Sequence, residues 1–78
     1  MAQRQRPIKL LDTVALLEDH SKGNLKRGEV GTVVEVLAPD VYEVEFSDDD
    51  GQTYAELALR RDQVVLLHNR GEALRIVA

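Results

Sequence analysis

Apolar and polar residues alternate most regularly in the middle of the chain, in the segment VYEVEFS at residues 41–47. A repeat of two residues is typical of a β-strand that buries one of its faces. We therefore predict a strand over 41–47 whose apolar side chains point into the core: Tyr42, Val44 and Phe46.

A matching segment, QTYAELALR at residues 52–60, follows the acidic stretch DDDG at 48–51. Gly51 can adopt the positive φ that a tight hairpin loop requires. Closing a hairpin over 48–51 pairs apolar residues with apolar or small ones, namely Phe46 with Thr53, Val44 with Ala55 and Tyr42 with Leu57. On the outward face, the same pairing puts Glu45 opposite Tyr54 and Glu43 opposite Glu56. A slip of one residue would turn every apolar side chain outward.

The residues before this hairpin are less regular. The segment at 8–20, IKLLDTVALLEDH, fits neither the period of a strand nor that of a helix. We predict a strand over 13–18, with a short helix over 11–19 as the alternative. Residues 19–28 are rich in turn formers and form a long loop. The β-branched segment EVGTVVEVL at 29–37 predicts a strand, within which its glycine, Gly31, marks a bulge or a sharp bend.

The C-terminal part of the chain completes the domain. RRDQ at 60–63 indicates a short polar turn, such as a single 3₁₀ turn, and VVLLH at 64–68 predicts the last strand. The sequence therefore predicts an all-β domain of five strands over residues 8–68. Residues 1–7 form a flexible arm, and residues 69–78 form either a loose tail or an added edge strand.

The composition fits one small intracellular domain. The chain has 78 residues, no cysteine and a formal net charge of -4. No disulfide framework is therefore possible, and neither a signal peptide nor an apolar run of about 18 residues is present. We expect a cytoplasmic protein that does not enter a membrane. An acidic chain is also repelled, on average, by the phosphates of nucleic acids.

Five strands in this order resemble an SH3-like barrel, and GEVGTVVEV at 28–36 resembles the glycine–valine motif of KOW modules, which share that barrel. More closely, residues 8–67 resemble a small bacterial family known as domain of unknown function 4926. The landmarks of this resemblance are Gly28, Gly31, Val44, Glu45, Phe46, Gly51 and Leu59. The resemblance implies a free-standing barrel without assigned catalytic residues, encoded beside small companion proteins of toxin-like type.

Catalytic and metal-binding patterns are weak. The three adjacent aspartates at 48–50 lack the alternate spacing and the final glutamate of an EF-hand loop. His20 and His68 supply two ligands, whereas a metal site needs three or four that converge. We predict a non-enzymatic protein with neither cofactor nor metal.

The outward face of the central hairpin is the leading candidate for binding. It carries Glu43, Glu45, Tyr54 and Glu56. Like charges directly across a strand pair are destabilising, so this face is suited to a cationic partner. Alternatively, the long glutamates splay into water and neighbouring strands supply cations. If the face binds a cationic partner, the chain is a protein-interaction module, such as an antitoxin-like or immunity partner of a basic companion protein.

Two further hypotheses stay open. Five basic residues lie in the long loop and in the turn before the last strand: Lys22, Lys26, Arg27, Arg60 and Arg61. By resemblance to SH3-like domains, these segments flank a ligand groove and would form a basic mouth, with scattered solubilising charge as the alternative. A KOW-like module would bind RNA through all of these residues except Lys22, namely Lys26, Arg27, Arg60 and Arg61. The surrounding glutamates and an aromatic content of 4% disfavour that role. A third hypothesis is self-association, in which LRIVA at 74–78 adds a strand to a neighbour's sheet.

Overall fold

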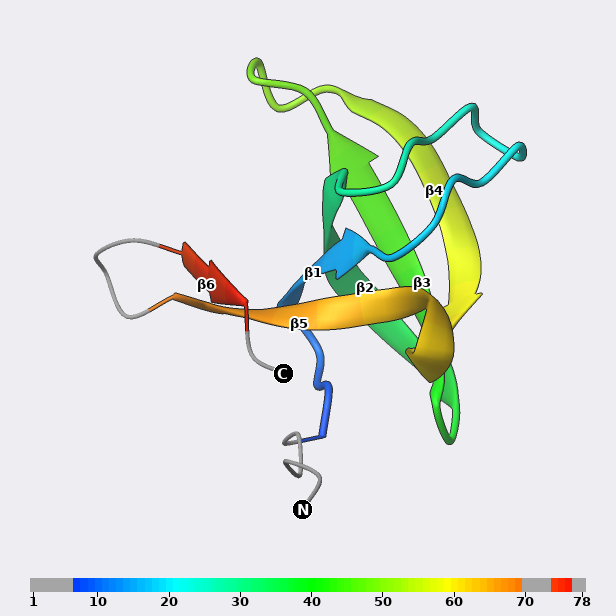
Figure 1. Ribbon diagram of the computed structural model, residues 1–78, viewed down its shortest axis with the longest axis vertical. Helices are drawn as coiled ribbons and strands as arrows, with labels where there is room; N and C mark the ends of the chain where they lie inside the picture. The colour runs from blue at the N-terminus through cyan, green and yellow to red at the C-terminus, as the bar shows by residue number, and fades with distance from the viewer. Residues whose placement is uncertain (1–6, 70–73, 77–78) are drawn as a thin grey trace.

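The computed structural model describes residues 7–69 and 74–76, and in this part the chain forms a single antiparallel sheet (Figure 1). Its elements are β1 (Thr13–Leu16), β2 (Val30–Ala38), β3 (Val41–Ser47), β4 (Thr53–Arg60), the 3₁₀ turn η1 (Arg61–Gln63), β5 (Val64–Asn69) and β6 (Leu74–Ile76). The strands lie in the order β4-β3-β2-β1-β5-β6. The all-β fold and the 3₁₀ turn are thus confirmed. Of the predicted N-terminal arm, only Pro7 lies within the described residues.

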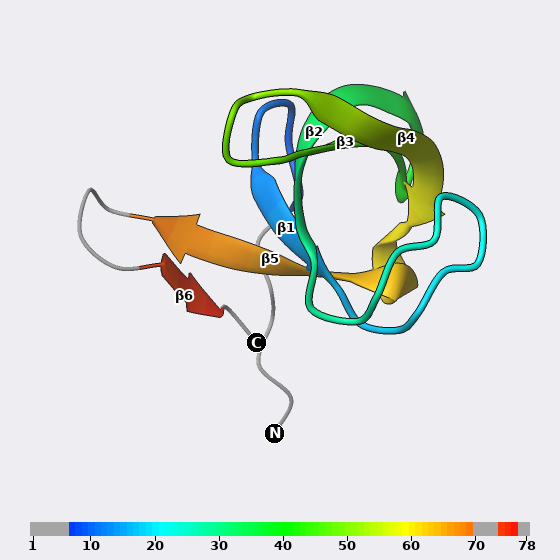
Figure 2. The ribbon, with the colours of Figure 1, turned by 90° about the horizontal axis from the view of Figure 1, so that it is seen from above.

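The sheet curls around its core but does not close (Figure 2). β4 and β6 stand at the two ends of the strand order, and η1 connects β4 to β5 without pairing them. The expected closed barrel of five strands is therefore not confirmed. A sixth strand, β6, pairs with the end of β5 and extends the sheet beyond the curled body.

The core lies inside the curl and is formed by the inward residues of the strands. Tyr42, Val44 and Phe46 are buried as predicted, because the alternation along β3 directs every second side chain inward. Leu25 comes from the long loop between β1 and β2, yet it is only 1% exposed. A Cβ at Gly23, two residues earlier, would lie 3.4 Å from the Cβ of Ala55 on β4. The loop therefore packs against β4 and contributes to the core.

The register between β3 and β4 differs from the predicted one by two residues. Tyr42 lies opposite Leu59, Val44 opposite Leu57 and Phe46 opposite Ala55. An irregularity between Phe46 and Ser47 contributes one residue of the shift, and a loop over 48–52, one residue longer than predicted, contributes the other. Because the shift is an even number, the faces are unchanged. The predicted partners were nevertheless wrong, including Glu43 with Glu56 and Glu45 with Tyr54.

Gly31 does not mark the bulge that the sequence suggested. The register shifts of β2 fall between Val33 and Glu35 and between Val36 and Ala38. Gly31 instead faces the interior where β2 and β3 approach closely, since a Cβ there would lie 2.7 Å from the Val44 Cγ1. This glycine is required for packing.

The uncertain segment at the start of the chain is extended. β1 pairs with β2 on one side and with β5 on the other, so the helical alternative over 11–19 is wrong. Two strand neighbours outweigh the helix propensity of Ala, Leu and Glu. The strand ends at Leu16, two residues earlier than predicted, because the chain then turns into the long loop.

Candidate functional site

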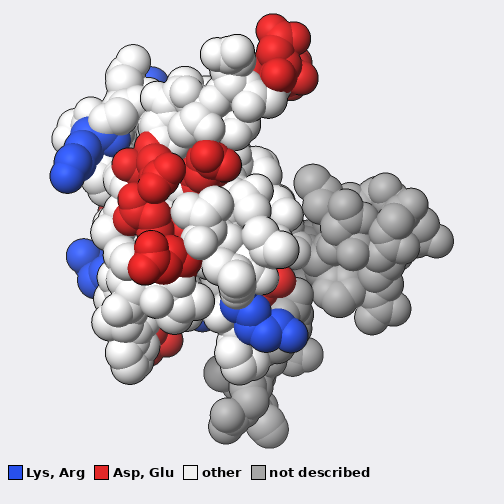
Figure 3. All heavy atoms as spheres, turned by 180° about the vertical axis from the view of Figure 1, so that it is seen from behind, with Lys and Arg blue, Asp and Glu red and all other residues white. Residues whose placement is uncertain are grey.

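Four glutamates gather on the outer surface of β2, β3 and β4, and we call them the acidic face: Glu35, Glu43, Glu45 and Glu56. Glu45 lies directly opposite Glu56, and Glu43 lies directly opposite Glu35. Figure 3 shows acidic side chains collected in the middle of one side of the molecule, with Lys and Arg side chains at its margins. The two cross-strand pairs are like-charged, an arrangement that weakens a sheet.

Glu43 lies at the centre of this face. Its pKa is raised, first by desolvation, then by a hydrogen bond with Glu56 and by the negative charges of Glu56 and Glu35. Lys22 in the long loop acts in the opposite direction, but its effect is the smallest. The local field therefore favours a neutral carboxyl or an incoming positive charge.

We expect Glu43→Gln to raise the free energy of unfolding at pH 7 by a few tenths of a kcal/mol, up to about 1 kcal/mol. The folded state binds a proton at Glu43 more tightly than the unfolded state does. The wild type therefore loses stability as pH rises through the raised pKa of Glu43. The advantage of the variant should appear above that pKa and disappear below the ordinary value of 4.5. Thermal unfolding at a series of pH values measures this difference.

Glu18→Gln serves as the control for this measurement, because Glu18 is exposed and lies outside the acidic face. Its stability should stay within about 0.5 kcal/mol of the wild type at every pH. An equal gain in both variants would show that overall charge, and not the acidic face, is responsible.

Tyr54 does not lie opposite Glu45 as predicted. Its hydroxyl donates a hydrogen bond of 2.6 Å to the Oε1 of Glu29, the residue just before β2. The Lys26 backbone N–H donates to the other carboxylate oxygen of Glu29 at 2.7 Å. The bond from Tyr54 is the main reason why the pKa of Glu29 is lowered, and it also raises the pKa of Tyr54. Tyr54 thus ties β4 to the end of the long loop, and Thr53 is the residue whose hydroxyl donates to Glu45, at 2.7 Å.

The five predicted basic residues are divided between two places. Lys22, Lys26 and Arg27 lie in the long loop, and Arg60 and Arg61 lie where β4 ends. Lys22 adjoins Gly23, which packs beside Ala55, and Arg60 lies five residues further along β4. Five residues of strand span about 17 Å. Lys22 therefore lies beside the first half of β4, whereas Arg60 and Arg61 lie at its end.

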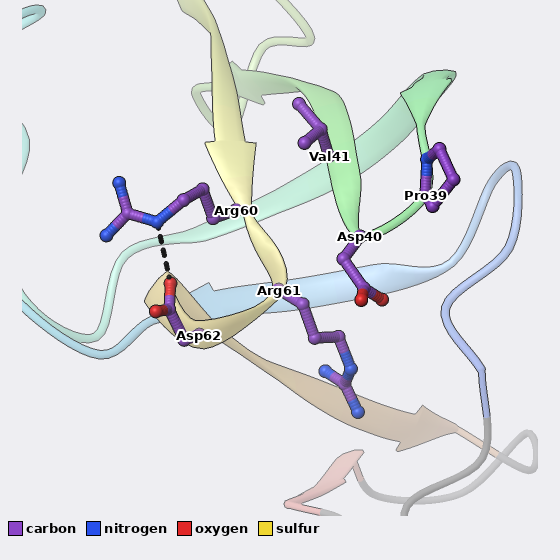
Figure 4. A pocket seen from close by; sticks show the side chains of 6 residues that line it. All are labelled: Pro39, Asp40, Val41, Arg60, Arg61 and Asp62. Atoms are coloured by element: carbon purple, nitrogen blue, oxygen red, sulfur yellow. Dashed lines mark hydrogen bonds and ion pairs between the residues drawn. The ribbon is translucent and has the colours of Figure 1, made fainter.

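Arg60 and Arg61 border an open hollow of about 410 Å³ together with Pro39, Asp40, Val41 and Asp62 (Figure 4). Arg60 points toward Asp62, and its Nε lies 3.1 Å from the Asp62 carboxylate. The backbone N–H of Arg61 donates to the Asp40 carbonyl oxygen at 2.8 Å. Two acids thus stand beside the two arginines, so the hollow is not a strongly cationic site.

Within residues 7–69 and 74–76, no group of three or more His, Cys, Asp or Glu side chains is arranged to hold a metal ion. The side chain of His68 is outside the described part, and His20 lies in the long loop. Among the described elements, none is a helix with the length and apolar character needed to cross a membrane.

The roles of two residues, Glu35 and Glu29, were not predicted from the sequence. Glu35 joins the acidic face only because the register of β2 shifts after Val33. Glu29 meets Tyr54 across 25 residues of chain. Neither contact has a local signal in the sequence, since a bulge and a long-range hydrogen bond both depend on the folded chain.

The comparison with known proteins identifies a family and no characterised relative. A family model described as "Domain of unknown function (DUF4926)" matches residues 10–66, from the turn before β1 to the middle of β5. Neither the curated proteins nor the solved structures contain a match to this chain. The matched segment holds all four glutamates of the acidic face and excludes β6. Because the match covers more than two thirds of its residues, this chain belongs to the family described as domain of unknown function 4926.

Proposed function

We propose that this protein is a non-catalytic, cytoplasmic interaction module built as an SH3-like barrel, and that its acidic face binds a basic companion protein. The meander of β2, β3 and β4, followed by a 3₁₀ turn and then β5, supports the SH3-like assignment. The loop that packs against β4 and the turn η1 lie beside the open side of the curled sheet.

The environment of Glu43 is the main support for the proposal. The pKa of Glu43 is raised first by desolvation and then by the neighbouring carboxylates of Glu56 and Glu35, so its ionised form destabilises the folded state. Such an arrangement has no structural benefit, but it is suited to receive Lys or Arg side chains. Complementary charge of this kind mainly accelerates association and selects the partner.

The class of partner follows from the family. The resemblance described above implies that these proteins are encoded beside small companions of toxin-like type, so we propose an antitoxin-like or immunity role in a bacterium. The partner would then be the product of the adjacent gene and would present a basic surface.

The test uses the full chain and the product of the adjacent gene. We expect the double variant Glu43→Gln, Glu56→Gln to associate more slowly by about tenfold at low salt, with a weaker salt dependence, in stopped-flow or surface-binding measurements. Glu18→Gln should bind like the wild type. Because the charge-removing variant is expected to be at least as stable as the wild type, slower binding cannot be attributed to unfolding.

Unchanged association of the double variant would contradict the proposal. The same variants separate it from RNA binding. Removing negative charge would strengthen retention of RNA at low salt, whereas it weakens binding to a basic protein.

A further inference from the structure

The outer surface of β1, β2 and β5 carries apolar side chains where polar ones are usual. In an antiparallel sheet with one buried face, the outward positions are normally polar. Here Val65, Ala15 and Val30 lie side by side across three strands, because Ala15 is opposite both Val65 and Val30. Two further residues lie on the same outward face: Leu67, on β5, and Leu17, directly after β1. We call these five residues the outer apolar patch: Ala15, Leu17, Val30, Val65 and Leu67.

The patch lies on the opposite face of the sheet from the buried core cluster. The core cluster contains the inward neighbours Val14, Leu16 and Leu66, but it contains neither Ala15 nor Leu67. Leu17 is 48% exposed and Val30 is 42% exposed, whereas Ala15 and Leu67 are each 8% exposed and Val65 is half-buried. Water therefore contacts the patch mainly at Leu17 and Val30. Leu17 and Val30, with Ala15 and Val65 between and beside them, leave apolar surface on the outer face that a partner can cover.

The patch and the acidic face belong to one continuous surface. Thr13 lies opposite Leu67 and Thr32, Thr32 lies opposite Glu45, and Glu45 lies opposite Glu56. These residues form one row across β5, β1, β2, β3 and β4. Neighbouring strands are about 4.8 Å apart, so Val30, the patch residue on β2, is one strand away from the glutamates on β3. A single partner segment can therefore contact both.

We propose that the outer apolar patch is a docking site for a basic amphipathic segment of the partner, whose apolar side chains cover the patch while its Lys or Arg side chains contact the acidic face. This inference rests on the proposed function and adds the chemistry of the segment that is recognised. A second copy of this chain is a poor occupant, because the net charge of -4 and the acidic face would repel each other. An anionic membrane is disfavoured for the same reason.

The test uses two synthetic ten-residue peptides, one alternating Lys with Leu and the other alternating Lys with Ser, each used at concentrations at which it is monomeric. Their affinities for the full chain are measured by fluorescence anisotropy. We expect the Lys–Leu peptide to bind at least tenfold more tightly than the Lys–Ser peptide. A tenfold ratio corresponds to 1.4 kcal/mol, which is about the value of one buried aliphatic side chain.

Variants then locate the site. Val30→Thr and Leu17→Gln, singly and together, should weaken the Lys–Leu peptide about fivefold to tenfold and leave the Lys–Ser peptide unchanged. Val36→Thr is the matched control, because Val36 lies on the same strand and is 49% exposed but lies beyond the part of β2 that pairs with β1. Val30→Thr keeps the β-branched shape that suits a strand, so the fold is maintained.

Equal affinity for the two peptides, or an equal effect of Val30→Thr and Val36→Thr, would overturn the inference about the patch. The proposed function would survive that result if both peptides still bound and if Glu43→Gln with Glu56→Gln weakened both. Failure of both peptides to bind would overturn the inference and the proposed function together.

Discussion

Gly31→Ala is expected to lower the free energy of unfolding by about 3 kcal/mol, at the upper end of the usual cost of overpacking. The added Cβ would lie 2.7 Å from the Val44 Cγ1, 2.9 Å from the Glu45 backbone oxygen and 3.0 Å from the Phe46 Cδ2. The backbone oxygen belongs to the neighbouring strand, so it cannot move without disturbing the ladder between β2 and β3. Val44 and Phe46 are fully buried and have no free space to enter.

Urea unfolding followed by circular dichroism measures this loss. Gly51→Ala is the informative control, because a Cβ at Gly51 meets nothing within 4 Å although its φ is +80°. That variant should lose only the cost of a left-handed conformation, about 1 kcal/mol. A larger loss at Gly51 than at Gly31 would show that the close approach of β2 and β3 is not what requires the glycine.

Leu25→Ala is expected to cost a comparable amount, about 3 kcal/mol, although Leu25 lies in a loop. The side chain is 1% exposed and belongs to the same buried cluster as Phe46 and Leu59. Truncation would leave a cavity under the loop, because His20 and Leu25 are joined by two backbone hydrogen bonds of 2.9 Å that limit collapse. A domain of this size has a total stability of about 4–12 kcal/mol, so the loss is a large fraction of it.

The control for Leu25 is Leu10→Ala, since Leu10 is 56% exposed in the turn before β1. That change should stay within about 0.5 kcal/mol of the wild type. Amide hydrogen exchange adds a second measurement, because loss of Leu25 should speed exchange in the loop more than in β3. Equal stability of the two variants would mean that the loop is not part of the cooperative core.

The faces of the strands were predictable because they depend only on local alternation. In β3, the three inward residues are apolar and the outward residues from Glu43 onward are polar, so Tyr42, Val44 and Phe46 were assigned to the core correctly. The turn residues at Gly51 and the polar segment before β5 were also recognisable, since turns have specific chemistry. For Leu25 there was no such signal, because a leucine in a loop has no periodic neighbours.

The register between β3 and β4 could not be predicted from local sequence patterns. A shift of two residues leaves every side chain on its own face, so alternation cannot distinguish the predicted register from the observed one. Glu45 therefore meets Glu56 instead of Tyr54, which itself reaches Glu29. Similarly, Val30 and Val65 are 35 positions apart in the chain, and only their common neighbour Ala15 makes them parts of one patch.

Four properties of this protein follow from the sequence alone: the all-β fold, the side chains that point inward along β3, the acidic character and the family. These properties depend on residue type and short-range order. The tertiary structure alone decided which glutamates stand opposite one another, that the curled sheet stays open, and that apolar and acidic surfaces adjoin. These features arise from strand register, bulges and long-range pairing, which depend on the packing of segments that are distant along the chain.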